Sequence, residues 1–192
     1  MTTRMTLAAV VLALPGTAPA QDGFAELKDQ CIACHGEAGQ SETPDTPSLG
    51  GLDAYYALVS LVGFRDGRRP SEIMVPITEE MSNNDLRAAA DWVAALPDPV
   101  PPEAPGDPEM MERGAALAAA HHCTQCHGAD LRGGKQMPSI RNQREDYLLK
   151  ALGDYKAERR FGDRAAMVEV VQDLDEAELS ALAHYVAHLP AE

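Results

Sequence analysis

The sequence predicts an all-α protein built from two similar halves, and three observations support this prediction. Apolar residues recur at helical spacing in several segments, and no segment shows the alternation expected of a strand. A short cysteine and histidine pattern occurs twice, 92 residues apart. Similarity between the halves also extends well beyond that pattern. The predicted domains are residues 21–97 and 109–192, joined by a proline-rich, stiff connector at residues 98–108.

The composition is that of a folded, acidic protein. Of the 192 residues, 16 are Lys or Arg and 30 are Asp or Glu, which gives a formal net charge of −14. Nucleic acid is not an expected partner, because its phosphates would be repelled. Aromatic residues make up only 5% of the chain. Two small domains therefore have little side-chain material for a large core, which favours a bulky apolar group at the centre of each.

Residues 1–20 are typical of a cleaved secretory signal. Arg4 precedes an apolar run from Leu7 to Leu14, and small residues at positions 18 and 20 form a cleavage site. The run is too short to span a bilayer, and no other stretch approaches about 18 uninterrupted apolar residues. Cleavage after Ala20 would leave 172 residues without a transmembrane segment. We therefore expect an exported protein in the periplasm, either free or peripherally associated with the membrane.

All four cysteines lie in two copies of a Cys-x-x-Cys-His pattern, at residues 31–35 and 123–127. In this pattern the two thiols bond to the vinyl groups of one haem, and the adjacent histidine supplies a nitrogen ligand to the iron. Chance would place two such patterns in a chain of this composition on the order of a few times per million. The sequence therefore predicts two covalent haem c groups. The predicted attachment and proximal ligand residues are Cys31, Cys34, His35, Cys123, Cys126 and His127.

Three other interpretations of the cysteines compete with haem attachment. A four-cysteine zinc site usually separates its pairs by a dozen or two residues, whereas Cys34 and Cys123 are 89 residues apart. A redox-active disulfide in each pattern would be expected in a strand-to-helix context, which neither pattern has. Disulfides that link the two pairs are compatible with the spacing. They leave both adjacent histidines unexplained.

The internal repeat predicts the second axial ligand of each iron. When the halves are aligned, only Met74 and Met167 face each other as a methionine pair, and they follow the proximal histidines by 39 and 40 residues. That length allows the chain to pass round a haem and return over its other face. Met81 faces Leu174 and is expected in the core. The alternative is that Met74 and Met167 only pack, because thioethers are common core residues.

Helix signals occur at matching places in both halves. Ser82 with Asp85, and Asp175 with Glu178, predict capping boxes that open two amphipathic helices. Pro97 and Pro190 close these two helices. Further helices are predicted over residues 24–30, 52–64, 109–122 and 146–158.

These residues resemble two class I cytochrome c domains in tandem, similar to the cytochrome c4 family of periplasmic dihaem electron carriers. The resemblance covers essentially residues 21–192 and includes Glu72–Pro76, which is similar to the ligand-methionine segment of the family. It implies that the carbonyls of Pro47 and Pro138 accept a hydrogen bond from the proximal imidazoles. Arg65 and Arg159 are candidates for neutralising haem propionates, and a solvated surface role is the alternative.

The resemblance implies an electron carrier that is not itself an enzyme. Expected partners are redox proteins: a quinol–cytochrome c reductase, a terminal oxidase, or a dehydrogenase or flavoprotein subunit. The dihaem subunit of flavocytochrome c sulfide dehydrogenase has the same plan, so a fixed electron-accepting subunit is the alternative. A haem enzyme would instead need an open axial position at one iron. His184 and His188, four residues apart on one helix face, are expected to be polar surface, with metal ligation as the alternative.

Overall fold

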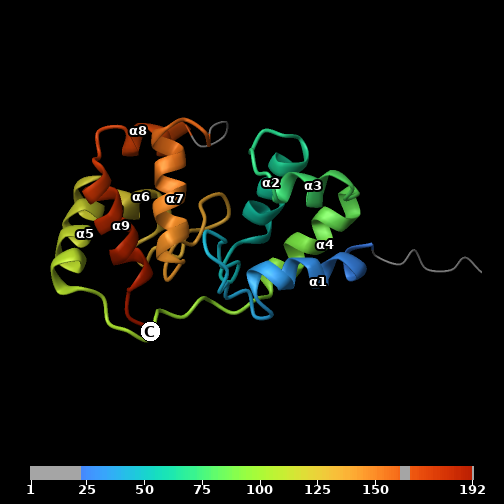
Figure 1. Cartoon of the computed structure of the whole chain (residues 1–192), viewed down its shortest axis with the longest axis horizontal. Coiled ribbons are helices and arrows are strands. Elements are labelled where there is room, and N and C mark those ends of the chain that lie inside the picture. Colours follow the sequence, from blue (N-terminus) through green and yellow to red (C-terminus); the bar gives the residue numbers. More distant parts are fainter. Residues whose placement is uncertain (1–22, 161–164, 192) are drawn as a thin grey trace, which may run out of the picture.

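The computed structural model describes residues 23–160 and 165–191, and these residues form nine helices and no strand, in two lobes (Figure 1). The predicted signal at residues 1–20 lies outside the described residues. None of the described helices has the length and apolar character that a membrane span requires. The all-α prediction is confirmed. The first lobe contains α1 (Phe24–His35), α2 (Ala54–Arg65), α3 (Met74–Glu79) and α4 (Asn83–Ala94). The second lobe contains α5 (Pro108–Ala120), α6 (Cys123–His127), α7 (Glu145–Lys156), α8 (Ala165–Val171) and α9 (Glu176–Ala187).

The last helix of each lobe begins with the capping box that the sequence predicts. The Ser82 hydroxyl accepts from the Asp85 N–H at 3.2 Å, while the Asp85 carboxylate accepts from the Ser82 N–H at 2.9 Å. Asp175 and Glu178 repeat this exchange at 2.8 and 2.9 Å. Each box satisfies two amide groups that the first turn would otherwise leave unpaired.

These two helices form the centre of each lobe. Helix α4 packs against α1 and α2, and α9 packs against α5 and α7. Met81 and Leu174, which face each other in the repeat, are 4% and 2% exposed, so the expectation that Met81 is a core residue is confirmed. The buried stripes of the two helices are Leu86, Ala89, Ala90 and Val93 in α4, and Leu179, Leu182, Ala183 and Val186 in α9.

Several features of the helices differ from the prediction. The helix expected over residues 24–30 continues through the first haem motif to His35. The helix expected over residues 109–122 ends at Ala120, because His122 has a left-handed backbone with φ of 57° that a right-handed helix cannot continue. The second haem motif therefore sits on a separate short helix, α6. The short helices α3 and α8, which contain Met74 and Met167, were not predicted.

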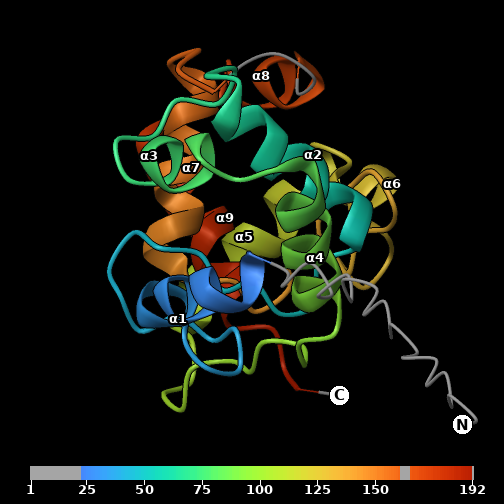
Figure 2. The same ribbon diagram turned by 90° about the vertical axis from the view of Figure 1, so that its right-hand side faces the viewer.

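The connector passes from one lobe to the other without helical structure between α4 and α5. The Val100 N–H donates to the Gln40 side chain at 3.0 Å, which holds the connector against the first lobe. Asp98 forms an ion pair with Arg132 of the second lobe. The first lobe lies in front of the second in Figure 2, and the two lobes approach each other through the loops around their haem motifs.

Candidate haem sites and the seam between the domains

Each proximal histidine is fixed by a proline carbonyl. His35 ends α1 and is 7% exposed, and its Nδ1 lies 2.8 Å from the carbonyl oxygen of Pro47. His127 ends α6 and is 6% exposed, with its Nδ1 2.9 Å from the carbonyl oxygen of Pro138. A carbonyl oxygen can only accept, so each Nδ1 carries the proton and each Nε2 is the unprotonated ring nitrogen. The structure thus brings together both histidine and proline pairs that the sequence singled out.

The surroundings of His35 favour its neutral form. Burial lowers the pKa of this imidazole below its ordinary value, against the opposing effect of the Pro47 hydrogen bond. A neutral imidazole with an unprotonated Nε2 is the form that ligates a metal.

The four cysteines are free thiols, which is not what either disulfide alternative requires. Cys31, Cys34 and Cys123 are half-buried and Cys126 is exposed. Burial raises the pKa of both Cys31 and Cys123. Among the described residues, the cysteines do not converge into a group of three or more metal ligands, as a shared zinc site would require. Two thiols and one imidazole with an unprotonated Nε2 fit one covalently attached haem, and this donor set occurs twice.

A glycine follows each proximal histidine and turns the chain back towards the proline. Gly36 and Gly128 have φ values of 82° and 83°, which glycine adopts without strain. A Cβ atom on Gly36 would lie 2.1 Å from the carbonyl oxygen of Gln40. No other residue fits Gly36 without moving the loop that brings Pro47 to His35.

The two predicted methionine ligands lie on short helices at matching places. Met74 begins α3, is half-buried, and donates its N–H to the Ser71 hydroxyl at 3.0 Å. Met167 is half-buried on α8 and packs against a buried cluster that Cys123 also contacts. Met167 and the second haem motif therefore border the same core. Iron ligation by both methionines stays a prediction.

Comparisons with known proteins agree with this arrangement. Residues 111–190 match the family model for cytochrome c. Cytochrome c4 of Thiocapsa roseopersicina is 27% identical over 190 residues, which cover 92% of this chain and 96% of that protein. The thiosulfate dehydrogenase electron acceptor of Stutzerimonas stutzeri (strain A1501) is 31% identical over 170 residues, or 83% of this chain and 78% of that protein. The chain belongs to the cytochrome c4 family.

The fold comparison points the same way. A crystal structure of reduced recombinant cytochrome c4 from Pseudomonas stutzeri matches with a TM-score of 0.79 and 25% identity, covering 90% of this chain and all of that one. Our protein is therefore an electron-transfer cytochrome that carries two covalent haem c groups in class I cytochrome c domains, as the sequence predicts. Its partners are redox proteins.

In this cytochrome c4, the loops that hold the proximal histidines also hold the domains together. Ser48, next to Pro47, is completely buried, and both of its backbone polar groups bond to the Gln143 side chain at 2.7 Å. Arg144 donates to the carbonyl oxygen of Ser41 at 3.0 Å. The seam between the domains is thus built on the same segments that position the haem ligands.

A second part of the seam is an exchange of side chains between repeat mates. Arg69 of the first domain donates to the Tyr147 hydroxyl of the second at 3.0 Å. Arg160 of the second domain donates to the Tyr56 hydroxyl of the first at 3.1 Å. Burial opposes ionisation of the Tyr147 phenol, but the charges of Arg160 and Arg69 outweigh it and lower its pKa to about 8.

Each of these arginines also stacks on an aromatic ring of its own domain. The guanidinium of Arg69 lies 4.4 Å from the centre of the Phe64 ring, and that of Arg160 lies 4.7 Å from the centre of the Tyr155 ring. Stacking of this kind orients a guanidinium and leaves its N–H groups free to point elsewhere. Both domains therefore present an oriented arginine to the seam.

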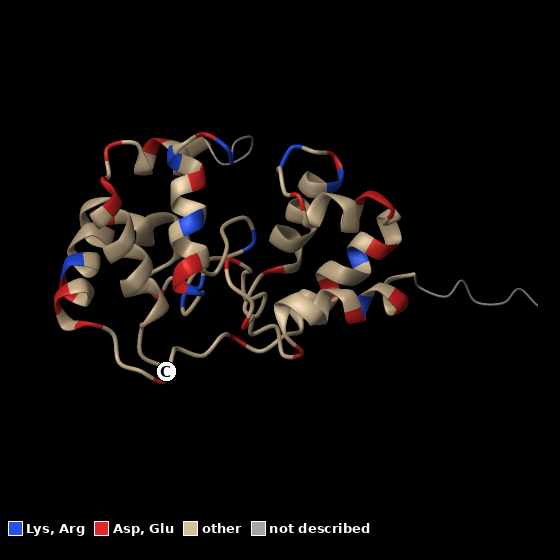
Figure 3. Ribbon diagram, in the orientation of Figure 1, with Lys and Arg blue, Asp and Glu red and all other residues tan. Residues whose placement is uncertain are grey.

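The arginines at the seam are not the ones that the sequence favoured. Arg65 donates to Asn83 at 2.8 Å, and Arg159 pairs with Asp154 at 2.8 Å. Within the described part of the chain, no carboxylate pairs with Arg69 or Arg160. Lys and Arg occur on the loops after α2 and α7, from which these side chains come (Figure 3). The repeat alignment held the signal, since it matches Arg68-Arg69 with Arg159-Arg160.

Proposed function

We propose that this cytochrome c4 relays single electrons between redox proteins in the periplasm and does not itself transform a substrate. In this proposal His35 and Met74 ligate one iron, and His127 and Met167 ligate the other. When bound, each haem supplies one-electron exchange between Fe(III) and Fe(II). The observation that supports the proposal best is the duplicated histidine–proline hydrogen bond, at 2.8 and 2.9 Å, in two domains fastened through the same loops.

The residues of the chain would set the properties of each site. The carbonyls of Pro47 and Pro138 hold the imidazole rings in one orientation and increase their basicity as ligands. Arg69 and Arg160 would hold haem carboxylates, because each guanidinium is oriented at the seam without a carboxylate partner among the described residues. The phenols of Tyr147 and Tyr56 occupy N–H groups that a haem carboxylate would compete for.

The seam would keep the two sites at a constant separation. Electron tunnelling falls off exponentially with distance, so a hinge that opened and closed would make the transfer rate fluctuate. The paired hydrogen bonds between Ser48 and Gln143 are buried, which makes them costly to break.

Carbon monoxide distinguishes a relay from a haem enzyme. It binds ferrous haem where the sixth position is open or easily vacated, so the fully reduced wild-type protein should bind none. The Met74→Ala and Met167→Ala variants should each bind one equivalent and serve as positive controls. One equivalent bound by the wild-type protein would contradict the relay and favour an enzyme with one open site.

We propose a dehydrogenase of the thiosulfate-oxidising class as the electron donor. The support is the 31% identical relative named a thiosulfate dehydrogenase electron acceptor. Acidic residues are spread over both lobes (Figure 3), so a donor with a basic docking patch would associate faster at low salt. Purified thiosulfate dehydrogenase with thiosulfate should reduce both haems, at a rate that falls as salt is added. Reduction only by a flavoprotein dehydrogenase would instead support the fixed-subunit alternative.

The periplasmic location rests on the N-terminal sequence alone. The chain with haem attached should be released with the periplasmic fraction and should begin at Gln21. A haem-bearing chain that retained residues 1–20 and stayed with the membrane would contradict this part of the proposal.

A further inference from the structure

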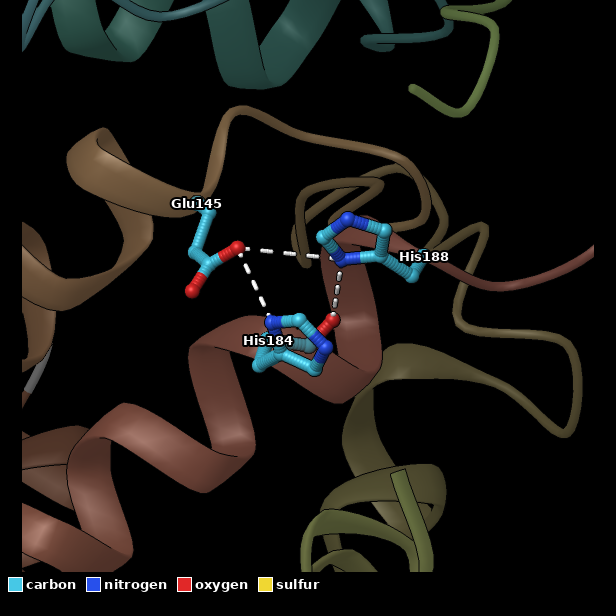
Figure 4. A group of neighbouring side chains, drawn as sticks. All are labelled: Glu145, His184 and His188. Carbon is cyan, nitrogen blue, oxygen red and sulfur yellow. Dashed lines mark hydrogen bonds and ion pairs between the residues drawn. The ribbon is translucent and has the colours of Figure 1, made fainter. Parts of the chain in front are cut away.

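Three potential metal ligands of the second domain converge at the C-terminal end of α9 (Figure 4). His184 lies on α9, His188 is the C-cap residue of that helix, and Glu145 begins α7. The Glu145 carboxylate oxygen Oε2 is 3.1 Å from Nδ1 of His184 and 3.7 Å from Nδ1 of His188. The two histidine side chains are only 13% and 11% exposed, so the expectation that they are open polar surface is wrong. Their rings stack, with centroids 4.2 Å apart, and Glu145 and Asp107 contact His184.

We propose that Glu145, His184 and His188 bind one divalent cation of the Zn²⁺, Cu²⁺ or Ni²⁺ class. Two imidazole nitrogens and a carboxylate oxygen suit these borderline metals better than Mg²⁺ or Ca²⁺. Zinc bonds of about 2.0–2.1 Å in a tetrahedron place neighbouring ligand atoms about 3.3 Å apart. The 3.1 and 3.7 Å separations lie on either side of that spacing. A water molecule would complete the tetrahedron.

The fold does not require this cluster. The repeat mates of Glu145, His184 and His188 are Ala54, Asp91 and Ala95, which cannot form the same group. Helices α2 and α4 of the first domain nevertheless pack together as α7 and α9 do in the second. Among the described residues, it is also the one group of three or more such side chains whose ligand atoms lie within 4.8 Å of one another.

Metal binding would change the hydrogen bonds at the start of α5. Nε2 of His184 accepts the Asp107 N–H at 2.8 Å, so Nδ1 carries the proton of the neutral ring and points it at Glu145. A cation at Nδ1 would shift that proton to Nε2, where it opposes the Asp107 N–H. Binding would therefore detach Asp107, the N-cap residue of α5, from α9. The carbonyl of His184 would also lose its contact with Nδ1 of His188, now 3.0 Å long. These losses predict a moderate affinity.

Isothermal titration of the oxidised holoprotein with zinc sulfate tests the site. The wild-type protein should bind one equivalent. Glu145→Gln keeps an oxygen that can accept from His184, and His188→Ala removes one nitrogen; each should weaken binding at least tenfold. His121→Gln, which removes a histidine outside the cluster, should leave the affinity unchanged. No zinc binding by the wild-type protein, or binding equally tight in both cluster variants, would overturn the proposal.

Amide hydrogen exchange tests the coordination through Nδ1. Zinc should speed exchange at Asp107 in the wild-type protein and have no effect at this amide in Glu145→Gln. Unchanged haem absorption and helical circular dichroism in each variant would show that the fold is intact. Exchange at Asp107 that stays slow while one zinc binds would contradict the proposed coordination.

Discussion

The two domains present the same histidine and proline contact on different helical supports. In the first domain, α1 runs without a break from Phe24 through the haem motif to His35. In the second, α5 ends at Ala120, His122 turns left-handed, and the motif occupies the separate helix α6. The Nδ1 to carbonyl distances are nevertheless 2.8 and 2.9 Å. The proline contact and the glycine after the histidine therefore set the ligand geometry, and the preceding helix is free to vary.

The domains also differ in the apolar core that they form from side chains alone. Among the residues that the structure describes, the buried core clusters contain seven residues in the first domain and twelve in the second. Both haem motifs border these clusters, through Cys31 and Cys123. Burial of apolar surface is the main stabilising contribution to a small domain. The first domain should therefore depend more strongly on its haem.

Removing one haem at a time should give the largest effect. Cys31→Ala with Cys34→Ala, and Cys123→Ala with Cys126→Ala, should each lower the mass of the exported chain by one haem. Without its haem, the first domain should be cut readily in limited proteolysis. The second domain without its haem should resist the protease better, because its side-chain core is larger. Equal protection of the two haem-free domains, or the reverse order, would show that core size does not decide the dependence.

Breaking the buried contact at the seam should cost less than losing a haem. Gln143→Leu leaves the N–H and carbonyl of the fully buried Ser48 without their partners, so the free energy of unfolding should fall by about 2–3 kcal/mol. The exposed Gln172, changed to Leu as a control, should cost less than about 0.5 kcal/mol. Chemical denaturation of both variants gives the comparison, and equal losses would mean that the seam contributes little.

The break between α5 and α6 predicts that a change to glycine has opposite effects on stability at His122 and at its repeat mate Gln30. His122→Gly removes the strain of a left-handed side-chain-bearing residue and should stabilise the protein by about 0.5–1 kcal/mol. Gln30→Gly, at the matching exposed position inside α1, should destabilise it by a similar amount, about 0.5–1 kcal/mol. Thermal unfolding of the two holoproteins distinguishes the signs. A loss of stability in both would contradict the backbone difference between the domains.

Acid should weaken the contacts of Asp146 at the exposed edge of the seam. This is the smallest of the predicted effects. The Arg144 side chain beside Asp146 holds the pKa of that carboxyl below its ordinary value, and the Asp45 N–H donates to the same group at 3.1 Å. A lowered carboxyl pKa adds stability above the unfolded value of about 4, and this stability is lost as the pH falls through the lower folded value. The unfolding free energies of wild type and Asp146→Asn should thus differ by a few tenths of a kcal/mol at pH 6, roughly the scale of an exposed ion pair. A difference in unfolding free energy that persisted at pH 3 would show that the charge of the Asp146 carboxylate is not its source.

The sequence predicts the fold best where residues close together in the chain decide the structure. Capping boxes at Ser82 and Asp175 follow from hydrogen bonds three residues apart, and both are present. The repeat also placed Met81 and Leu174 in matching core positions. Each of these features is decided within one turn of helix or by one aligned pair.

Long-range contacts could not be predicted in the same way. The hydrogen bond between Arg69 and Tyr147 joins residues 78 positions apart. The alignment matches each of them with a residue of the other half, and it does not show that the two contact each other across the seam. His184 and His188 were expected on the surface because helical spacing does not reveal that Glu145 and the start of α5 cover them. The left-handed backbone of His122 carried only a weak signal, because histidine adopts positive φ more often than most residues but far less often than glycine.

The most direct test of the central claim, two methionine-ligated haems in one chain, is the far-red sulfur-to-iron absorption band of the oxidised protein during an optical redox titration. The account predicts the intensity of two haems in the wild-type protein, and half of it in both Met74→Ala and Met167→Ala. Half intensity in the wild-type protein, or a band untouched by either substitution, would contradict it.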